Sequence, residues 1–506
     1  MKGAVAAGHP KTAEAAMRMY ELGGNAFDAA LAATAAACVV EPVLTSLGGG
    51  GFLLARRQGQ SPVLYDFFVQ TPRQRRAAAE CDFYPVIADF GTAQQEFHIG
   101  AGAIATPGTV RGLVSTQRAL GTLPLHEILA PAIEYASQGV EINALQAYIF
   151  GIVAPIYRAT PAAAALYSGE ALQGEGTLFH QPALASTLDW LASEGDAPFY
   201  LGELADRLVS LCQDHGGHLS HHDLANYRVI ERAPLHCRYH GYDVATNPAP
   251  SSGGTLISFA LTALQGQDLA QSGFGTARHL KTLGWVMAHT NVARQDGMLA
   301  RSEHHRQLLD QYRAAVQGHP VNNRGTTHIS TIDSAGNSAA LTLSNGEGSG
   351  HLLTDSGIML NNMLGEEDLN PAGFNRWPCN VRVSSMMAPT LAEAKGQLIA
   401  IGSGGSNRLR SAILQTLVNM IDFDMTAQQA VEAPRIHFER DRLDIEPDLA
   451  DDALRALYAD FPNHRIWDSP NLFFGGTHTV CWDGRRFSGA GDPRRGGVFA
   501  CSGGAG

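Results

Sequence analysis

Residues 325–333 read GTTHISTID, a β-branched alternating run, and this stretch decides the fold. Alternation with period two in a run rich in threonine and isoleucine is typical of a β-strand. The next four residues, SAGN at 334–337, have turn chemistry, and a second strand-like run extends from Ser338 to Ser344. The pattern therefore predicts a β-hairpin with its turn at Ala335 and Gly336.

The hairpin predicts which residues of its two strands face each other. Counting outward from the turn places Ser344 opposite Thr326, or within one residue of it. Two hydroxyl groups are therefore expected to meet at the start of the first strand.

The N-terminal part of the chain predicts helices separated by glycines. Thr12 to Leu22 has helical periodicity and stops at a glycine pair, and an alanine-rich helix begins at Asp28 and ends at Glu41. Residues 45–54, TSLGGGGFLL, then run from a loop into a strand. A glycine run cradles a phosphate when a helix N-terminus follows it, so the strand disfavours nucleotide binding.

The rest of the chain predicts a mixed α and β protein. Residues 108–230 read mostly helical, further helices are expected at 255–265 and 277–299, and strands return in the last third. The chain has 506 residues, of which 45% are hydrophobic, so it can bury a large core. Its 55 glycines are spread evenly and no linker separates halves, which favours one unit or two subdomains with a shared core.

The net charge and the cysteines limit the kinds of partner and the cellular setting that the sequence predicts. The net charge of −12, with no basic stripe, disfavours nucleic acid and anionic membranes, and a small molecule is the expected partner. The longest apolar run, Ala29 to Val40, is too short to cross a bilayer and reads as a buried helix. The opening MKGAVAAGHP lacks a signal-peptide layout, and seven scattered cysteines form no CxxC motif. These features predict a reducing, cytoplasmic setting.

Histidine clusters raise the question of a metal. His215, His218, His221 and His222 gather in one short stretch, and residues 304–305 form a histidine pair. Both groups lie in polar, helix-flanking sequence, which favours surface histidines over metal ligands. No metal and no cofactor is expected.

The Thr-Thr-His strand resembles that of the gamma-glutamyltranspeptidase family, whose members are N-terminal-nucleophile hydrolases that cut themselves before a threonine. Similar landmarks occur in family order along the whole chain. They are GGNAFDA at 23–29, GGGGF at 48–52, TPG at 106–108, PSSGG at 250–254, TTH at 326–328, LNN at 360–362, SSM at 384–386, GSGG at 402–405, APR at 433–435 and DPR at 492–494.

The resemblance implies a fold and a division of the chain. The implied fold class is α+β, a four-layer αββα sandwich in which two antiparallel sheets lie between helices. Self-cleavage between Gly325 and Thr326 would give a large subunit of residues 1–325 and a small subunit of residues 326–506. The two subunits of one precursor then form the enzyme, and the oligomeric state beyond that, a homodimer of heterodimers included, stays open.

The chemistry explains why Thr326 must become a chain terminus. A threonine hydroxyl is a poor nucleophile, whereas an α-amine has a pKa of roughly 7.7–8.0 and can take the hydroxyl proton near neutral pH. Before cleavage this amine is part of a peptide bond, so Thr326 would first attack the Gly325 carbonyl to give an ester that water opens. Glycine tolerates the strained geometry that this step needs.

The resemblance also implies further site residues. Ser344 stands where the family has a hydroxyl that hydrogen-bonds the nucleophile, and the backbone amides of Gly405 and Ser406 stand at the oxyanion hole. For a γ-glutamyl substrate, the α-carboxylate would be held by two serines and the α-amine by an amide and an acidic side chain. These substrate-binding residues are Ser384, Ser385, Asn345 and Glu366.

The largest departure from the family is Phe68, which replaces an arginine that pairs with the substrate α-carboxylate. Losing that charge-assisted hydrogen bond weakens glutamate binding by about ten- to a hundredfold. Either Arg382 or Arg408 compensates, or the natural substrate lacks a carboxylate there. The segment 363–383 is shorter than the family's lid-bearing loop, with Trp377 as its bulky feature, and an open site favours hydrolysis over transfer.

Three functions remain open on the sequence. The first is a γ-glutamyl hydrolase or transferase acting on glutathione or a related amide through a threonine acyl-enzyme. The second is an acylase of the same fold for a different acyl group, such as a cephalosporin or glutaryl amide, which Phe68 favours. The third is a processing-incompetent homologue that serves as a binding protein.

Overall fold

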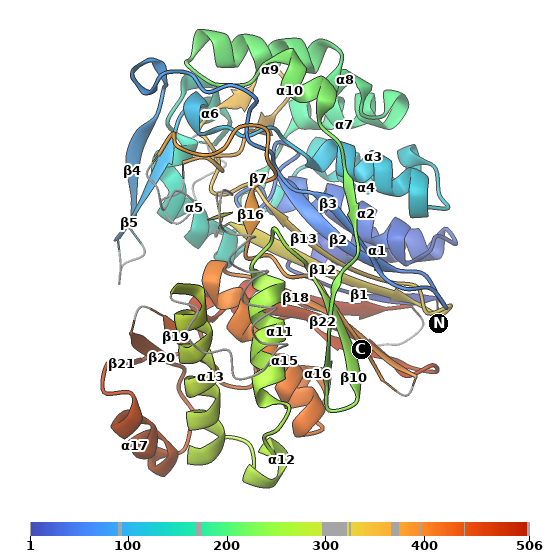
Figure 1. Cartoon of the computed structure of the whole chain (residues 1–506). Coiled ribbons are helices and arrows are strands. Elements are labelled where there is room, and N and C mark those ends of the chain that lie inside the picture. The colour runs from blue at the N-terminus through green and yellow to red at the C-terminus, as the bar shows by residue number, and fades with distance from the viewer. Residues whose placement is uncertain are drawn as a thin grey trace.

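The structure is a computed structural model that combines helices with two large sheets (Figure 1). The class expected from the sequence, mixed α and β, is confirmed. The residues it describes are 2–89, 94–167, 174–295, 321–322, 325–365, 374–394, 396–439 and 441–502.

The larger sheet has seven strands, in the order β24-β1-β12-β13-β2-β3-β8, and every neighbouring pair is antiparallel. The sheet contains strands from before and after residue 325, so the parts expected to become two subunits share one sheet. The strand bounds are β1 Gly3–Ala7, β2 Gly50–Arg56, β3 Val63–Phe67, β8 Ile230–Arg232, β12 Thr326–Asp333, β13 Ser338–Ser344 and β24 Val498–Cys501.

The predicted hairpin is the centre of this sheet. β12 and β13 pair with each other, and Thr326 lies directly opposite Ser344. Both the turn position and the register expected from the sequence are therefore confirmed. All residues of both strands are buried, because helices cover one face of the sheet and a second sheet covers the other.

The second sheet has six strands, in the order β23-β22-β18-β17-β10-β9. β18 and β22 contact β12, so the two sheets pack face to face over a shared apolar core that includes Phe52, Ala340 and Ile399. The bounds are β9 Leu235–Tyr239, β10 Tyr242–Thr246, β17 Thr390–Ala394, β18 Gln397–Gly404, β22 Gly476–Trp482 and β23 Phe487–Ala490.

Helices cover the outer face of each sheet (Figure 1). α1 and α2 pack on the seven-stranded sheet, and both begin and end within two residues of the bounds expected from the sequence. α2 is buried along its whole length, because its alanines allow close packing on every side, and Asn25 caps it. The bounds are α1 Pro10–Glu21, α2 Ala26–Val40 and, on the six-stranded sheet, α11 Gly253–Leu264, α15 Leu409–Asp422 and α16 Ala427–Glu432.

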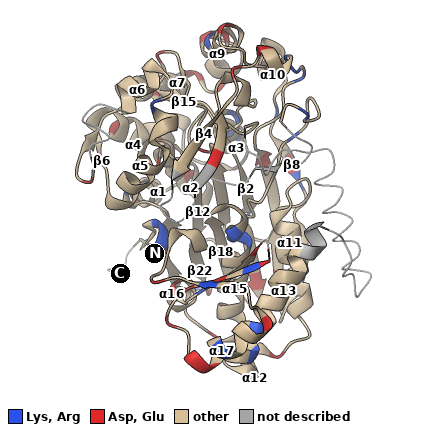
Figure 2. Cartoon of the chain, turned by 90° about the vertical axis from the view of Figure 1, so that its left-hand side faces the viewer, with Lys and Arg blue, Asp and Glu red and all other residues tan. Residues whose placement is uncertain are grey.

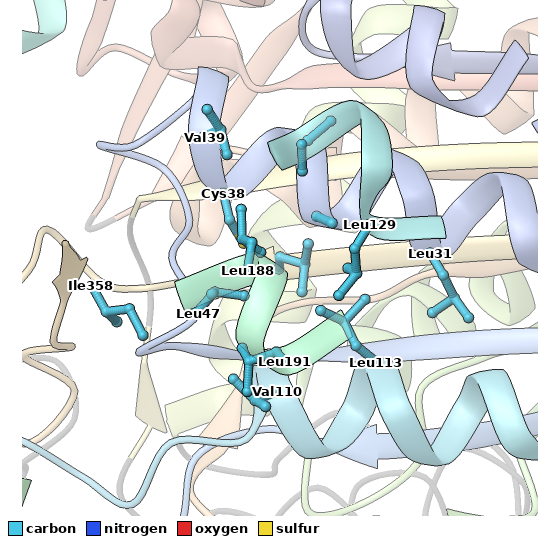
Figure 3. Close-up of a cluster of buried hydrophobic side chains, with 14 of the residues drawn as sticks. Leu31, Cys38, Val39, Leu47, Val110, Leu113, Leu129, Leu188, Leu191 and Ile358 are labelled. Carbon is cyan, nitrogen blue, oxygen red and sulfur yellow. The ribbon is translucent and has the colours of Figure 1, made fainter. Parts of the chain in front are cut away.

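The segment expected to be mostly helical folds beside α2. Its helices bury leucine and valine side chains against α2, as Leu113, Leu129 and Leu188 show in Figure 3. The bounds are α3 Thr109–Leu120, α4 Leu125–Gln138, α5 Ala144–Tyr157, α6 Pro161–Tyr167, α7 Pro182–Glu194, α8 Ala197–Tyr200, α9 Glu203–Asp214 and α10 His221–Asn226.

The remaining elements are shorter or peripheral, apart from the long helix α13. Helices α12 Leu269–Ser272, α13 Ala277–Gln295 and α17 Asp451–Asp460 lie near strands β19 Ile436–Glu439, β20 Arg442–Ile445 and β21 His464–Ile466. The other strands are β4 Tyr84–Asp89, β5 Gln94–Ile99, β6 Val140–Glu141, β7 Leu178–Phe179, β11 Val321–Asn322, β14 Leu352–Leu353, β15 Ile358–Met359 and β16 Ser384–Ser385.

The described helices give no sign of a membrane span, since none is both long and apolar enough to cross a bilayer. Acidic and basic residues are interspersed over the ribbon in Figure 2. Most of the ribbon in that view is tan, which agrees with the low fraction of charged residues, 17%.

The contact between the two sheets predicts a stability defect. An added Cβ at Gly402 would overlap the His328 ring, which cannot move because Thr342 and Ser330 hydrogen-bond its two nitrogens. We expect Gly402→Ala to lower the free energy of unfolding by about 1–3 kcal/mol, measured by denaturant titration. Gly151→Ala in α5, where the new methyl meets open space, is the control and should leave stability unchanged or raise it.

Candidate active site

Thr326 and Ser344 come together at the end of the central hairpin. Thr326 is the first residue of β12 and Ser344 the last of β13, and both side chains are buried. Since side chains alternate along a strand, Thr326 faces the six-stranded sheet together with His328, whereas Thr327 faces α2. The Thr326 and Ser344 hydroxyls therefore lie together at one end of the seven-stranded sheet, on the face that packs against the six-stranded sheet.

The Ser344 hydroxyl is bonded to the peptide group that precedes Thr326. Its Oγ donates a hydrogen bond to the Gly325 carbonyl oxygen at 2.5 Å and accepts one from the Gly346 N–H at 3.1 Å. The Gly325 N–H in turn donates to Oε1 of Glu347 at 3.2 Å. The carbonyl of the Gly325–Thr326 peptide is thus held and polarised by a hydroxyl donor, and Glu347 holds the N–H of the preceding peptide.

Position 325 requires glycine because the backbone of two other segments comes close to its Cα atom. A Cβ atom added there would overlap the Gly346 carbonyl oxygen and lie 3.2 Å from the Val43 carbonyl oxygen. A residue with a side chain cannot occupy this position without moving the carbonyl group away from Ser344.

The glycine turn expected as an oxyanion hole follows β18. Gly405 and Ser406 have positive φ angles of 119° and 61°, a left-handed conformation that opens the turn. Neither of their N–H groups donates a hydrogen bond to a described residue. Two open backbone donors beside Thr326 are the arrangement that can stabilise a developing negative charge on oxygen.

Gly325, Gly405 and Ser406 line one cleft with a cavity volume of about 90 Å³, whereas the buried Thr326 and Ser344 are not part of its lining. Another part of the lining is an apolar wall, with α5 as its main contributor. Charged groups complete the cleft. The further lining residues are Val43, Leu44, Ile149, Ile152, Val153, Glu347, Arg408, Leu472 and Arg495.

Titratable groups behind β12 are neutral or hydrogen-bonded within the core. Burial raises the pKa of Glu41, whose two oxygens accept hydrogen bonds from Thr12 at 2.8 Å and from Thr327 at 2.6 Å. Burial holds the pKa of His328 well below its ordinary value, so its ring is neutral. Both groups hold the strand that carries Thr326.

The residues expected to hold a substrate lie apart from the cleft lining. Ser384 and Ser385 are buried, and the Ser384 Oγ donates to the Pro250 carbonyl at 2.6 Å. The amide side chain of Asn345 is buried without a hydrogen-bond partner among described residues. Glu366 lies outside the described residues.

Phe68 is a core residue in this structure. Its ring stacks on Phe52 with 5.3 Å between centroids, and it does not line the cleft. Arg382, one of the two cations expected to compensate, is buried in an ion pair with Asp66 at 3.2 Å and donates to the Phe68 carbonyl. Arg408 is the other, and it lies at the cleft.

Sequence reasoning missed Glu347 and Arg495, which are charged residues at the cleft. Arg495 directly follows the DPR landmark, and that adjacency was the available signal. One expectation about side-chain position was wrong. His218, expected at the surface, is buried and packs edge-on against the Trp377 ring, which is also buried.

Metal ligation finds no support in the part of the chain that the structure describes. No group of three histidine, cysteine or carboxylate side chains there could hold an ion. Residues 304–305, the second histidine pair, lie outside the described ranges.

Comparisons with known proteins agree on one family. The family model for gamma-glutamyltranspeptidase matches residues 12–502. The acylase ACY 1 proenzyme of Pseudomonas sp. (strain V22) is 31% identical over 509 residues, covering 95% of this chain and 90% of that protein. The glutathione hydrolase proenzyme of Escherichia coli (strain K12) is 30% identical over 502 residues, with coverages of 90% and 85%.

A solved structure supports the same fold. The crystal structure of cephalosporin acylase from Bacillus halodurans matches with a TM-score of 0.83 and 24% sequence identity, covering 100% of this chain and 96% of that one. At this identity the likeness concerns the fold alone.

Proposed function

The chain belongs to the gamma-glutamyltranspeptidase family and is an acyl-amide hydrolase of the glutathione hydrolase kind, and on this premise we propose that Thr326 is its nucleophile. The chain is then made as a precursor that cuts itself between Gly325 and Thr326. The freed Thr326 hydrolyses a γ-glutamyl amide, or the amide of a related acyl group, through an ester intermediate.

One observation carries this proposal: the hydrogen bond from Ser344 to the Gly325 carbonyl oxygen at 2.5 Å. The bonded carbonyl is the one that self-cleavage must attack, and a hydroxyl donor already stands where negative charge would develop. An ordinary strand threonine has no need of such an arrangement.

Self-cleavage then proceeds through an ester between Gly325 and Thr326. The Thr326 Oγ attacks the Gly325 carbonyl carbon, the C–N bond breaks, and the nitrogen takes the hydroxyl proton to become a free α-amine. Water then hydrolyses the ester and leaves Gly325 with a carboxylate. In the mature enzyme this amine takes the Thr326 hydroxyl proton as the hydroxyl attacks a substrate amide. The amides of Gly405 and Ser406 support the oxyanion, and Ser344 holds the nucleophile.

The resulting chains would be residues 1–325 and 326–506. They would stay together after cleavage because both large sheets combine strands from each part. The sequence of layers, helices on a sheet on a second sheet on helices, fits the αββα sandwich of N-terminal-nucleophile hydrolases.

The acyl donor has two candidates. For a γ-glutamyl donor, Asn345, Glu366, Ser384 and Ser385 remain the proposed contacts, and glutathione is the first substrate to try. The second candidate is an acylase for an acyl group other than glutamate. The apolar wall of α5 and the burial of Phe68 favour this alternative. In either case we expect hydrolysis over transfer, in a cytoplasmic setting.

The first prediction concerns the cut itself. Intact mass under denaturing conditions should give two chains for the wild type, divided between Gly325 and Thr326, and one uncut chain for Thr326→Ala. The variant lacks the attacking hydroxyl, so it should also hydrolyse no γ-glutamyl anilide. A wild type that stays whole under all conditions would contradict self-processing and favour the binding-protein reading.

Ser344 provides the second prediction. Ser344→Ala removes the donor to the Gly325 carbonyl, and loss of one such donor slows acyl transfer by about a hundred- to a thousandfold. The rate of appearance of the two chains after cell-free synthesis measures this. Ser344→Thr keeps the hydroxyl and serves as the matched control. Equal rates for all three proteins would mean that the hydroxyl has no part in the cut.

Gly325 provides a third prediction, on geometry alone. Gly325→Ala keeps every reacting group but forces the carbonyl away from Gly346 and hence from Ser344. We expect self-cleavage at least about tenfold slower, since a misplaced reacting group can cost a hundredfold. The same cell-free assay measures it, and wild-type speed in this variant would show that the observed close packing is not needed.

A further inference from the structure

At the edge of the cleft, Arg495 is a cation with no ionic partner in the part of the chain that the structure describes. It ends the 3₁₀ turn Pro493–Arg495 and is partly buried. Its neighbour Arg494 pairs with Glu446 at 2.7 Å, and Arg435 pairs with Asp492 at 2.6 Å. Arg495 forms no ion pair with any described residue, and its Nε is buried without a hydrogen-bond partner. One guanidinium nitrogen donates to the Leu472 carbonyl at 3.3 Å.

The carboxylates near Arg495 are already engaged. Glu41 accepts from the Thr12 and Thr327 hydroxyls, and Asp492 is bound by Arg435. Burial and the neighbouring Arg408 lower the pKa of Arg495 to about 10, so it still carries its charge at neutral pH. A partly buried cation that forms no ion pair with a described residue is costly to keep, which points to an anion that the site binds.

The position of Arg495 places its charge beside the reacting groups. A Cβ added at Gly404 would lie 3.2 Å from Nη1, and one added at Gly405 would lie 3.2 Å from Nη2. The guanidinium therefore packs directly on the glycine turn. Gly404 also borders the Thr326 carbonyl oxygen. An acyl group attached to Thr326 would lie within reach of this cation.

Arg408 adds a second positive charge on the same side. It belongs to the 3₁₀ turn Ser406–Arg408, lines the same cleft, and packs over the Phe473 ring at 4.6 Å. Phe68, by contrast, places an apolar ring in the core, and Arg382 is bound to Asp66. The side of the glycine turn thus carries two cations, whereas the cation next to Phe68, Arg382, is paired with Asp66.

We propose that Arg495, with Arg408 beside it, binds a carboxylate at the far end of the acyl group. The acyl donor is then an amide of a short dicarboxylic acid, such as a glutaryl or γ-glutamyl amide, whose methylenes pack on the apolar wall of α5. This inference rests on the proposed function. A guanidinium offers a planar pair of donors that matches a carboxylate, which a lysine in the same place would not.

The test compares two anilides that differ in one group. One is the anilide of glutaric acid, with a free carboxylate at its far end, and the other carries a primary amide there. In the wild type we expect the carboxylate substrate to have the lower KM. In Arg495→Gln, KM for it should rise about ten- to a hundredfold with kcat within about threefold, and the amide substrate should change little. Arg485→Gln, an exposed arginine with the same change of charge, is the control.

Equal effects on both substrates, or an effect on kcat alone, would overturn the assignment and give Arg495 a role in the turn or the oxyanion. Self-cleavage of Arg495→Gln shows that the variant folds. If the variant does not cleave itself, inhibition of the wild type is measured instead. Glutarate should inhibit hydrolysis of the amide substrate with an inhibition constant at least about tenfold lower than that of glutaramide. Equal inhibition overturns the proposal.

The two proposals fail in different ways. A wild type that neither cuts itself nor hydrolyses either anilide contradicts the proposed function. A wild type that cuts itself and hydrolyses both anilides with the same KM contradicts only the role of Arg495.

Discussion

The hydrogen bond between Ser344 and the Gly325 carbonyl depends on the register of one hairpin, and the rest of the site is arranged around that register. A shift by one residue would turn Thr326 toward α2 and remove it from Ser344, because side chains alternate along a strand. The flanking strands β1 and β2 and the buried threonines of β12 oppose such a shift. Burial of both sheet faces, by α2 and by the six-stranded sheet, therefore does more than stabilise the fold, since it also fixes the two hydroxyls.

Close packing around the hairpin follows from small residues. α2 lies flat on the sheet because most of its residues are alanine, and the six-stranded sheet comes near the His328 ring because Gly402 has no side chain. At the end of that same strand, the glycine turn reaches the Thr326 carbonyl. The sequence of β18, apolar and then rich in glycine, first builds the core between the sheets and then leaves room for the cleft.

Local patterns in the sequence predicted the parts of the fold that depend on neighbours along the chain. The hairpin, its register, α1 and α2 follow from periodicity, turn residues and caps within short windows. The family resemblance located the glycine turn. The charged lining of the cleft could not be found this way, because Glu347 and Arg495 are far apart in the chain and meet only through the tertiary structure. For Phe68, the residue type predicted altered substrate binding, and that stays a prediction; the direction of its ring toward Phe52 depends on packing between sheets.

The charges of the cleft also bear on the base that the proposed mechanism needs. Before cleavage, residue 326 contributes a neutral peptide nitrogen. Afterwards it contributes an α-amine, which acts as a base only while unprotonated. A nearby positive charge disfavours protonation, so in the proposed mechanism Arg408 and Arg495 would lower the pKa of this amine, whereas the carboxylate of Glu347 would raise it. A bound substrate carboxylate would neutralise part of the arginine charge and shift this balance. If both proposals hold, substrate recognition and the basicity of the Thr326 amine are coupled through the same cations.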